Sequence, residues 1–154
     1  MNGTVHQHLV FGATGAVGAS LVRLLVEQGD RVFLAGRNAE RLNELTRELS
    51  LPGCLVSATE PASIDRCFES AMSEFGSIDG VANCIGSVLL KPAHLTTEAE
   101  WQETLATNLG SAFAITRAAG RHLRARGGSV VFVSSAAARQ GLANHEAIAS
   151  AEAG

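Results

Sequence analysis

The sequence predicts an α/β fold of three layers, with helices on both faces of a parallel β-sheet. Three observations predict it. Strand patterns alternate with helical patterns along all 154 residues, which is typical of parallel strands joined by helical crossovers. Three spaced glycines follow the first strand and open the first helix. The composition, 46% hydrophobic and 18% charged, is that of one globular domain, expected to span residues 1–154.

Five apolar segments separated by turn residues predict the strands. Because a helical pattern follows each of them, the strands are expected to be parallel and buried on both faces. In the Rossmann-type αβα sandwich the strand order is 3-2-1-4-5, and a crevice lies at the carboxyl ends of strands one and four. The predicted strands are residues 5–11, 31–35, 54–57, 80–85 and 129–134.

Apolar residues at helical spacing predict the helices between these strands. In residues 15–28 the side chains of Val17, Leu21, Leu24 and Leu25 recur on one face, which is therefore expected to face the core. The other predicted helices are residues 38–49, 61–75 and 97–126, with a last helix beginning at about residue 144.

Three of the helix starts carry an N-terminal signal. Asn38 is a favoured N-cap residue, and Pro61 suits the first turn of the third helix. Thr97 and Glu100 have the spacing of a capping box, in which each side chain binds the backbone N–H of the other residue.

Composition and charge argue against several functions. A net charge of −3 does not favour nucleic acid or an anionic membrane as partner. The sequence has no apolar run of about 18 residues and no signal-peptide pattern, so a cytoplasmic protein is expected. The three cysteines form no CxxC pair and are expected to be reduced, mostly buried side chains. No metal site is predicted, because His6 and His8 have no third ligand at matching spacing.

The glycines at positions 12, 15 and 18 lie between the first strand and the first helix. A turn without Cβ atoms lets backbone N–H groups approach a pyrophosphate closely. The N-terminus of the helix adds its free donors and the positive end of its dipole. This placement between strand and helix predicts a dinucleotide site.

Three segments carry a resemblance to a known family. They are the loop Gly12-Ala-Thr-Gly-Ala-Val-Gly18, the run Ala82-Asn-Cys-Ile-Gly86 after strand four, and Ser134-Ser135 after strand five. With them the chain resembles the short-chain dehydrogenase/reductase family over essentially its whole length. The resemblance implies hydride transfer between a nicotinamide dinucleotide and a small-molecule substrate, a carbonyl or alcohol. Asn83 and Gly86 match the family's Asn-Asn-Ala-Gly segment, while Cys84 and Ile85 depart from it.

The residues at the end of strand two indicate whether NAD(H) or NADP(H) is the cofactor. An acidic residue there would bind the ribose hydroxyls of NAD, but the sequence has Arg37. A guanidinium holds a 2′-phosphate bidentately, so NADP(H) is favoured over NAD(H); a solvated helix-start residue is the alternative for Arg37. Ser57 stands where the family usually has an adenine-binding aspartate. The predicted cofactor-binding residues are Gly12, Thr14, Gly15, Val17, Gly18, Arg37, Asn38, Ser57, Asn83, Gly86 and Glu152.

The resemblance also implies a catalytic set, and this sequence has only part of it. Asn108 and Ser135 match the asparagine that holds a relay water and the serine that steadies the substrate oxygen. Ile148 occupies the position of the family's proton-donating tyrosine, and Glu152 that of its lysine. The sequence contains no tyrosine at all, so the usual proton relay is absent.

Three interpretations follow from this departure. In the first, His145 supplies the proton, because it lies three residues before Ile148 on the same predicted helix face; an exposed helix-start histidine is the alternative. In the second, the chain binds NADP(H) without turnover, as a sensor or interaction module, and Glu152 accepts a hydrogen bond from a ribose hydroxyl. In the third, the chain is an incomplete relative of an active enzyme.

The resemblance implies further C-terminal strands and a substrate segment that are lacking after Gly154. Strand five is then expected to be an uncovered edge of a parallel sheet, and such edges favour pairing. Self-association into a homo-oligomer is therefore expected.

Overall fold

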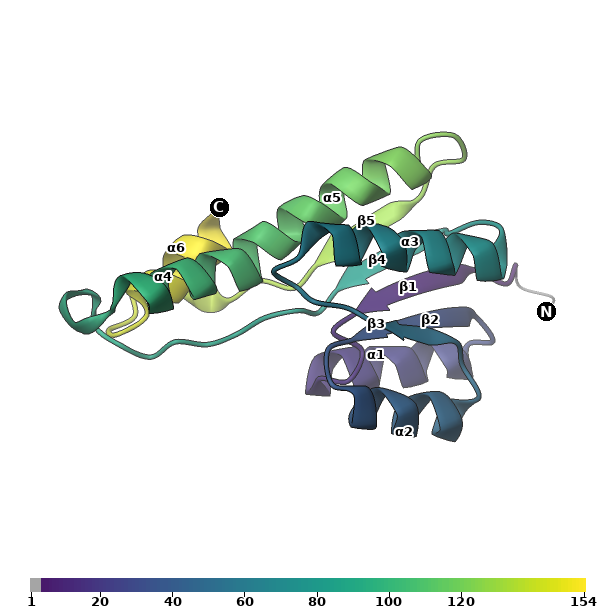
Figure 1. Cartoon of the computed structure of the whole chain (residues 1–154), viewed down its shortest axis with the longest axis horizontal. Helices are drawn as coiled ribbons and strands as arrows, with labels where there is room; N and C mark the ends of the chain where they lie inside the picture. Colours follow the sequence, from purple (N-terminus) through teal and green to yellow (C-terminus); the bar gives the residue numbers. More distant parts are fainter. Residues whose placement is uncertain (1–3) are drawn as a thin grey trace.

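The computed structural model describes residues 4–154 and contains one five-stranded parallel sheet in the order β3-β2-β1-β4-β5. The predicted α/β class and strand order are confirmed. Figure 1 shows α1 and α2 on one face of the sheet and α3 and α5 on the other. The strands are β1 Gln7–Phe11, β2 Arg31–Gly36, β3 Gly53–Leu55, β4 Gly80–Asn83 and β5 Ser129–Phe132.

The helices follow the strands in the predicted alternation, and the last of them, α6, lies beside α4 (Figure 1). The α-helices are α1 Ala16–Glu27, α2 Ala39–Leu49, α3 Pro61–Phe75, α4 Glu98–Leu105, α5 Ser111–His122 and α6 Glu146–Ala153. Three shorter segments are the 3₁₀ turns η1 Ala93–Leu95 and η3 Ala136–Ala138 and the π-helical segment η2 Ala106–Gly110.

Each face of the sheet has its own buried core, because successive side chains of a strand point to opposite faces. Leu9 and Phe11 of β1 pack with Phe68 of α3, and the rings of Phe11 and Phe68 lie 5.6 Å apart. The neighbouring Val10 packs on the opposite face with Val22 of α1. The strands are therefore buried on both sides, as expected of a parallel sheet.

Helix α1 packs on the sheet with only part of the predicted face, since Leu21 and Leu25 contact the core but the other two predicted side chains do not. Val17 and Leu24 are each 56% exposed, whereas Gly18 and Val22 are buried. The cause is Gly18, where an added Cβ would contact the carbonyl of Gly12. Because the backbone of α1 approaches the Gly12 turn closely at Gly18, the side of the helix that carries Gly18 and Val22 faces the sheet.

The predicted long helix of residues 97–126 is divided in the structure. Helix α4 leads into the π-helical segment η2, which continues as α5 and ends at His122. Beyond it the N–H of Gly127 donates to the carbonyl of Leu123, and Gly127 has a φ of 78°. The helix ends with Leu123 as its C-cap, and the turn that follows it ends at Gly127, where glycine tolerates the left-handed conformation.

Other boundaries differ by a few residues. Strand β4 ends at Asn83, whose side-chain oxygen accepts a hydrogen bond from the N–H of Ile85 and so turns the chain out of the ladder. Helix α6 begins at Glu146, because Asn144 has a φ of 63° that does not fit a helix. The predicted strands at residues 54–57 and 129–134 are likewise shortened, to Gly53–Leu55 and Ser129–Phe132.

Strand β5 forms one edge of the sheet, and within residues 4–154 it pairs with β4 alone. Val131, Phe132 and Val133 are 58%, 41% and 47% exposed. None of the helices in the described part of the chain is long and apolar enough to cross a membrane. The cytoplasmic location stays a prediction.

Candidate functional site

A cleft of about 620 Å³ lies at the carboxyl ends of β1, β2, β3 and β4, where the prediction puts the crevice. The segments that follow these four strands form most of its wall, and α4 with η2 closes it on one side. Its lining residues are Gly12, Thr14, Gly15, Gly36, Arg37, Asn38, Arg41, Val56, Ser57, Ala58, Thr59, Cys84, Ile85, Gly86, Glu103 and Thr107.

The glycine loop between β1 and α1 is shaped by backbone contacts that leave no room for side chains. Gly12 has a φ of 71°, and a Cβ there would lie 2.6 Å from the carbonyl oxygen of Cys84. The N–H of Gly15 donates to the carbonyl of Gly12 over 3.0 Å, which tightens the turn. The loop therefore needs glycine for its own geometry, whatever it binds.

Helix α1 begins at this loop with Gly15 as its N-cap, and no side chain among the described residues caps it. The first N–H groups of a helix have no partner within the helix. Together with the dipole they favour an anion at this end. The bare start of α1, which opens beside the cleft, therefore fits a diphosphate.

Two arginines flank the cleft where β2 ends. Arg37 precedes α2 and Arg41 lies in its first turn, and both line the cleft. Asn38 is the N-cap, as predicted, and its side-chain oxygen accepts a hydrogen bond of 2.9 Å from the N–H of Arg41. Within residues 4–154 neither guanidinium forms an ion pair with a carboxylate. Arg41 was not among the predicted site residues, although its place four residues after Arg37, on the helix that Asn38 caps, was a usable signal.

The segment after β4 forms the facing wall. The carbonyl of Cys84 lies against Gly12, and burial raises the pKa of the Cys84 thiol. Asn83 is buried and shapes this turn through its bond to Ile85 without lining the cleft. Gly86 lines it.

Asn108 holds the continuation of this segment against the helix. It is buried in η2, contrary to the solvent-facing position common for asparagine within helices. Its side-chain oxygen accepts the N–H of Ser87 over 2.9 Å, and its amide nitrogen donates to the Ser87 hydroxyl and to the carbonyl of Thr104. The side chain is thus fully occupied in fixing the loop. Its neighbour Thr107 lines the cleft.

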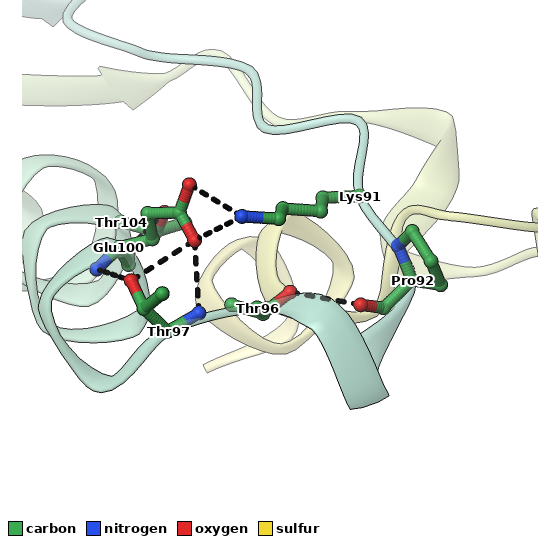
Figure 2. A network of polar contacts seen from close by, with 6 residues as sticks. All are labelled: Lys91, Pro92, Thr96, Thr97, Glu100 and Thr104. Carbon is green, nitrogen blue, oxygen red and sulfur yellow. Dashed lines mark hydrogen bonds and ion pairs between the residues drawn. The ribbon is translucent and has the colours of Figure 1, made fainter.

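An ion pair fixes the same loop further along (Figure 2). The Lys91 ammonium donates to both oxygens of Glu100 at 2.8 and 2.7 Å, and Glu100 also completes the predicted capping box with Thr97. The ammonium of Lys91, followed by hydrogen bonds from Thr97, lowers the pKa of the Glu100 carboxyl to about 2. The N–H of Lys91 donates to the carbonyl of Asn144, so this loop also contacts the segment that precedes α6.

None of the three predicted catalytic residues, Asn108, Ser135 and His145, lines the cleft. Ser135 is exposed at the start of η3, where its hydroxyl oxygen accepts the N–H of Ala137. His145 precedes α6, with Nδ1 at 2.7 Å from the carbonyl oxygen of Ala143. Ile148 is buried, whereas Glu152 is half-buried and contacts Ser134 through its backbone carbonyl.

The predicted cofactor-binding residues divide into two sets. Those that line the cleft are Gly12, Thr14, Gly15, Arg37, Asn38, Ser57 and Gly86; those that do not are Val17, Gly18, Asn83 and Glu152. Besides Arg41, the cleft is lined by residues of loops and of a helix that no sequence pattern connects to the site. These unpredicted residues include Val56, Ala58, Thr59, Glu103 and Thr107.

The histidines at the start of β1 lie at the amino ends of the strands, away from the cleft. His8 Nε2 is 3.1 Å from a carboxylate oxygen of Asp30, and His6 Nδ1 is 3.9 Å from Asp79. Hydrogen bonds from the backbone of His6 and the ring of His8 lower the pKa of the Asp30 carboxyl. Each imidazole thus faces a different carboxylate.

Known proteins of similar sequence and fold point to one group of enzymes. D-threitol dehydrogenase of Mycolicibacterium smegmatis is 32% identical over 145 residues, which cover 90% of this chain and 56% of that protein. NADP-dependent 3-hydroxy acid dehydrogenase of Shigella flexneri is 34% identical over 113 residues, 71% of this chain and 46% of that one. The chain spans about half the length of the curated relatives it matches.

Solved structures lead to the same group of proteins. Serine dehydrogenase of Escherichia coli matches with a TM-score of 0.88 and 28% identity over 96% of this chain and 70% of that one. The closed form of serine dehydrogenase complexed with NADP+ matches with a TM-score of 0.89 and covers 96% of this chain and 61% of that one. The family described as short chain dehydrogenase matches residues 7–154. The chain belongs to the short-chain dehydrogenase family of oxidoreductases.

Proposed function

We propose that the cleft binds NADP(H) in preference to NAD(H). The observation that carries this proposal is the pair of guanidiniums of Arg37 and Arg41, which line the cleft with no carboxylate partner within residues 4–154. Two such cations fit the extra phosphate of NADP, since arginine binds phosphate through paired N–H groups. Two relatives bear names or titles that include NADP.

The diphosphate in the middle of the cofactor is proposed to bind at the glycine loop. The uncapped first turn of α1 and the turn at Gly12 suit the diphosphate. Ser57 follows β3 and lines the cleft, where it is proposed to contact the adenosine. Asn83, Gly18 and Val17 are proposed to act through the shape of the two loops, since none of them lines the cleft.

The proposed reaction is hydride transfer between NADP(H) and a carbonyl or alcohol. When bound, the nicotinamide supplies or accepts the hydride. Ser135 accepts a backbone N–H with its oxygen, so its own hydroxyl hydrogen is left to donate to a substrate oxygen. His145 is proposed to move the proton. Because a carbonyl oxygen only accepts, Nδ1 of His145 donates to Ala143, and Nε2 is the nitrogen left for proton exchange.

Binding without turnover is the second candidate, and one observation favours it. Ile148 is buried at the position where the family resemblance implies a tyrosine, and an isoleucine carries no titratable proton. In this candidate the chain is an NADP(H)-binding module, and Glu152 accepts a hydrogen bond from a ribose hydroxyl.

Calorimetric titration with NADPH and with NADH tests the cofactor proposal. The wild-type chain is expected to bind NADPH more tightly. Arg37→Ala together with Arg41→Ala should weaken NADPH binding at least about tenfold, since hydrogen bonds between charged groups each contribute roughly 1.5–3 kcal/mol. Binding of NADH should change little. Arg47→Ala, at the far end of α2, is the matched control, and equal affinity of the wild type for both dinucleotides would contradict the proposal.

Turnover separates the two candidates. The absorbance of NADPH is followed with a panel of ketones and quinones. Oxidation that is lost in His145→Ala and kept in the neighbouring Gln140→Ala supports the proton role of His145, and oxidation that survives in both rejects that role. Binding without any oxidation supports the second candidate.

We also propose that copies of the chain associate through the exposed edge of β5. The support is its apolar side chains, from Val131 to Val133, and the tendency of open edges to pair.

A further inference from the structure

Two of the three cysteines contact each other, although they are 13 residues apart in the sequence. The Sγ atoms of Cys54 and Cys67 lie 3.0 Å apart. A disulfide bond is about 2.05 Å long, so the two sulfurs are about 1 Å from bonding distance. Both thiols are free in the structure.

The elements that carry these cysteines hold them in this position. Cys54 is the middle residue of β3, the edge strand that pairs with β2 within the described residues. Cys67 lies in the middle of α3, on the buried face that also carries Ile64 and Phe68. Cys67 is fully buried, and Cys54 is half-buried at the border of the same core. Only Cys54 is therefore open to a reagent from solvent.

We propose that Cys54 and Cys67 form a reversible dithiol–disulfide site that reacts with small-molecule disulfides such as oxidised glutathione. Cys54 is the attacking residue and Cys67 the resolving residue. This site is separate from the proposed dinucleotide function and does not depend on it.

Exposure assigns the two roles, since Cys54 is half-buried and Cys67 is buried. The two thiols share a hydrogen bond over 3.0 Å, and this bond lowers the pKa of Cys54 despite its partial burial. The same bond, and then burial, raise the pKa of Cys67. The thiolate is the reactive form of cysteine, so the accessible member of the pair is also the one that ionises first.

The reaction is an exchange in two steps. The Cys54 thiolate attacks one sulfur of the glutathione disulfide, whose S–S bond breaks, and one glutathione thiolate leaves. The Cys67 sulfur gives up its proton and attacks the sulfur of Cys54, which expels the second glutathione. In total the two cysteines lose two electrons and two protons. The glutathione disulfide gains these two electrons and two protons and becomes two glutathione thiols.

The loop that the bond would close contains part of the cleft wall. Residues 55–66 connect the two cysteines and include Val56, Ser57 and Thr59, all of which line the cleft. The N–H of Ser57 already donates to the Ser63 hydroxyl within this loop. A bond between its ends restricts the unfolded chain, so the oxidised protein is expected to melt about 5–10 °C higher than the reduced one.

The experiment uses the Cys84→Ala variant, which retains only the proposed pair. After treatment with oxidised glutathione and then unfolding, its two titratable thiols should fall to none. The mass should decrease by two hydrogen atoms with no glutathione attached, and dithiothreitol should reverse both changes. In wild-type protein, peptide mapping should give one cross-linked peptide that joins Cys54 to Cys67, which makes the test independent of how the variants fold.

Single variants test the assigned roles. Cys67→Ser should retain one glutathione on Cys54, and Cys54→Ser should stay unmodified while folded. The proposal is overturned if the Cys84→Ala variant keeps both thiols, retains bound glutathione, or forms a reducible link between two copies in place of the internal bond.

Discussion

At Gly18 the chain has no room for a side chain, and the reason is contact between two backbone segments. A Cβ at this position would meet the Gly12 carbonyl oxygen and lie 2.8 Å from the Gly12 carbonyl carbon. Neither atom can move aside without opening the turn that precedes α1. The requirement for glycine thus follows from the fold of the chain itself and does not depend on a ligand.

Gly18→Ala is therefore expected to destabilise the chain by roughly 1–3 kcal/mol, as overpacking of a tight contact does. Gly120→Ala is the matched control, because Gly120 lies in α5 with open space around its Cβ position. Alanine there should raise stability by up to about 1 kcal/mol, since glycine is the poorer helix former. Urea unfolding of both variants measures the two effects, and equal stabilities for the two would show that the contact at Gly18 relaxes freely.

Individual site residues were predictable where a local pattern names them. The spacing of Gly12, Gly15 and Gly18 marks a turn, and Arg37 marks the end of β2. Glu103 and Thr107 line the same cleft, but they enter it from a helix that only the tertiary fold brings there. No spacing rule within one segment reports such an approach.

At the scale of elements, the start of α4 shows how one carboxylate can serve two purposes. Glu100 closes the capping box with Thr97 and also binds the Lys91 ammonium of the preceding loop. The helix start and the loop after β4 are therefore held by the same group (Figure 2).

This shared carboxylate predicts a specific pH dependence. The pKa of Glu100 is lowered from 4.5 to about 2 in the folded chain. A lowered folded pKa adds stability that is fully present above 4.5 and is lost as the pH falls towards about 2. The difference in unfolding free energy between the wild type and Glu100→Gln should therefore be constant above this window and shrink within it.

Chemical unfolding at a series of pH values measures that difference. The control is Lys91→Met, which removes the largest cause of the lowered pKa. In that background the pH-dependent part of the Glu100→Gln effect should be much smaller. A difference that stays the same at every pH would contradict the assignment.

Elements with strong end signals were predicted closely. Helix α3 spans Pro61–Phe75 as predicted, and Asn38 and Thr97 cap their helices. The predicted long helix is present over residues 98–122, but the prediction did not include the π-helical turn around Asn108, which no spacing rule reports. For α1 the prediction was right for Leu21 and Leu25, which pack against the core. It was wrong for Val17 and Leu24, which are exposed because the contact at Gly18 brings the Gly18 side of the helix to the sheet.

At the scale of the whole molecule, the sheet is open on the β5 side. Val131 is more than half exposed there, and the strand's outer hydrogen-bonding groups face no other strand of the described chain. Unpaired strand edges with apolar side chains favour association with another copy.

Sedimentation velocity over a range of concentrations is expected to show self-association of the wild type. Val131→Lys should reduce it, because an edge lysine hinders pairing between strands. Val88→Lys is the matched control, since Val88 is 74% exposed but lies in the loop after β4. A monodisperse monomer in the wild type, or equal effects of the two lysines, would contradict association through this edge.

The overall architecture was accessible from the sequence because alternation of strands and helices leaves few topologies for a parallel sheet. The contact between Cys54 and Cys67 was not, since the two residues belong to different elements and share no spacing rule. The predicted burial of the cysteines holds fully for Cys67 alone, whereas Cys54 and Cys84 are half-buried.

The two separate cores have a consequence for how this chain tolerates change. Val32 and Leu34 belong to the core on one face of the sheet, and Phe33 between them belongs to the core on the other face. A void opened on one side does not reach the atoms on the other, because the backbone of five strands stands between them. Evolution or redesign can therefore replace the side chains of one core at a time, while the core on the opposite face keeps the strands in register.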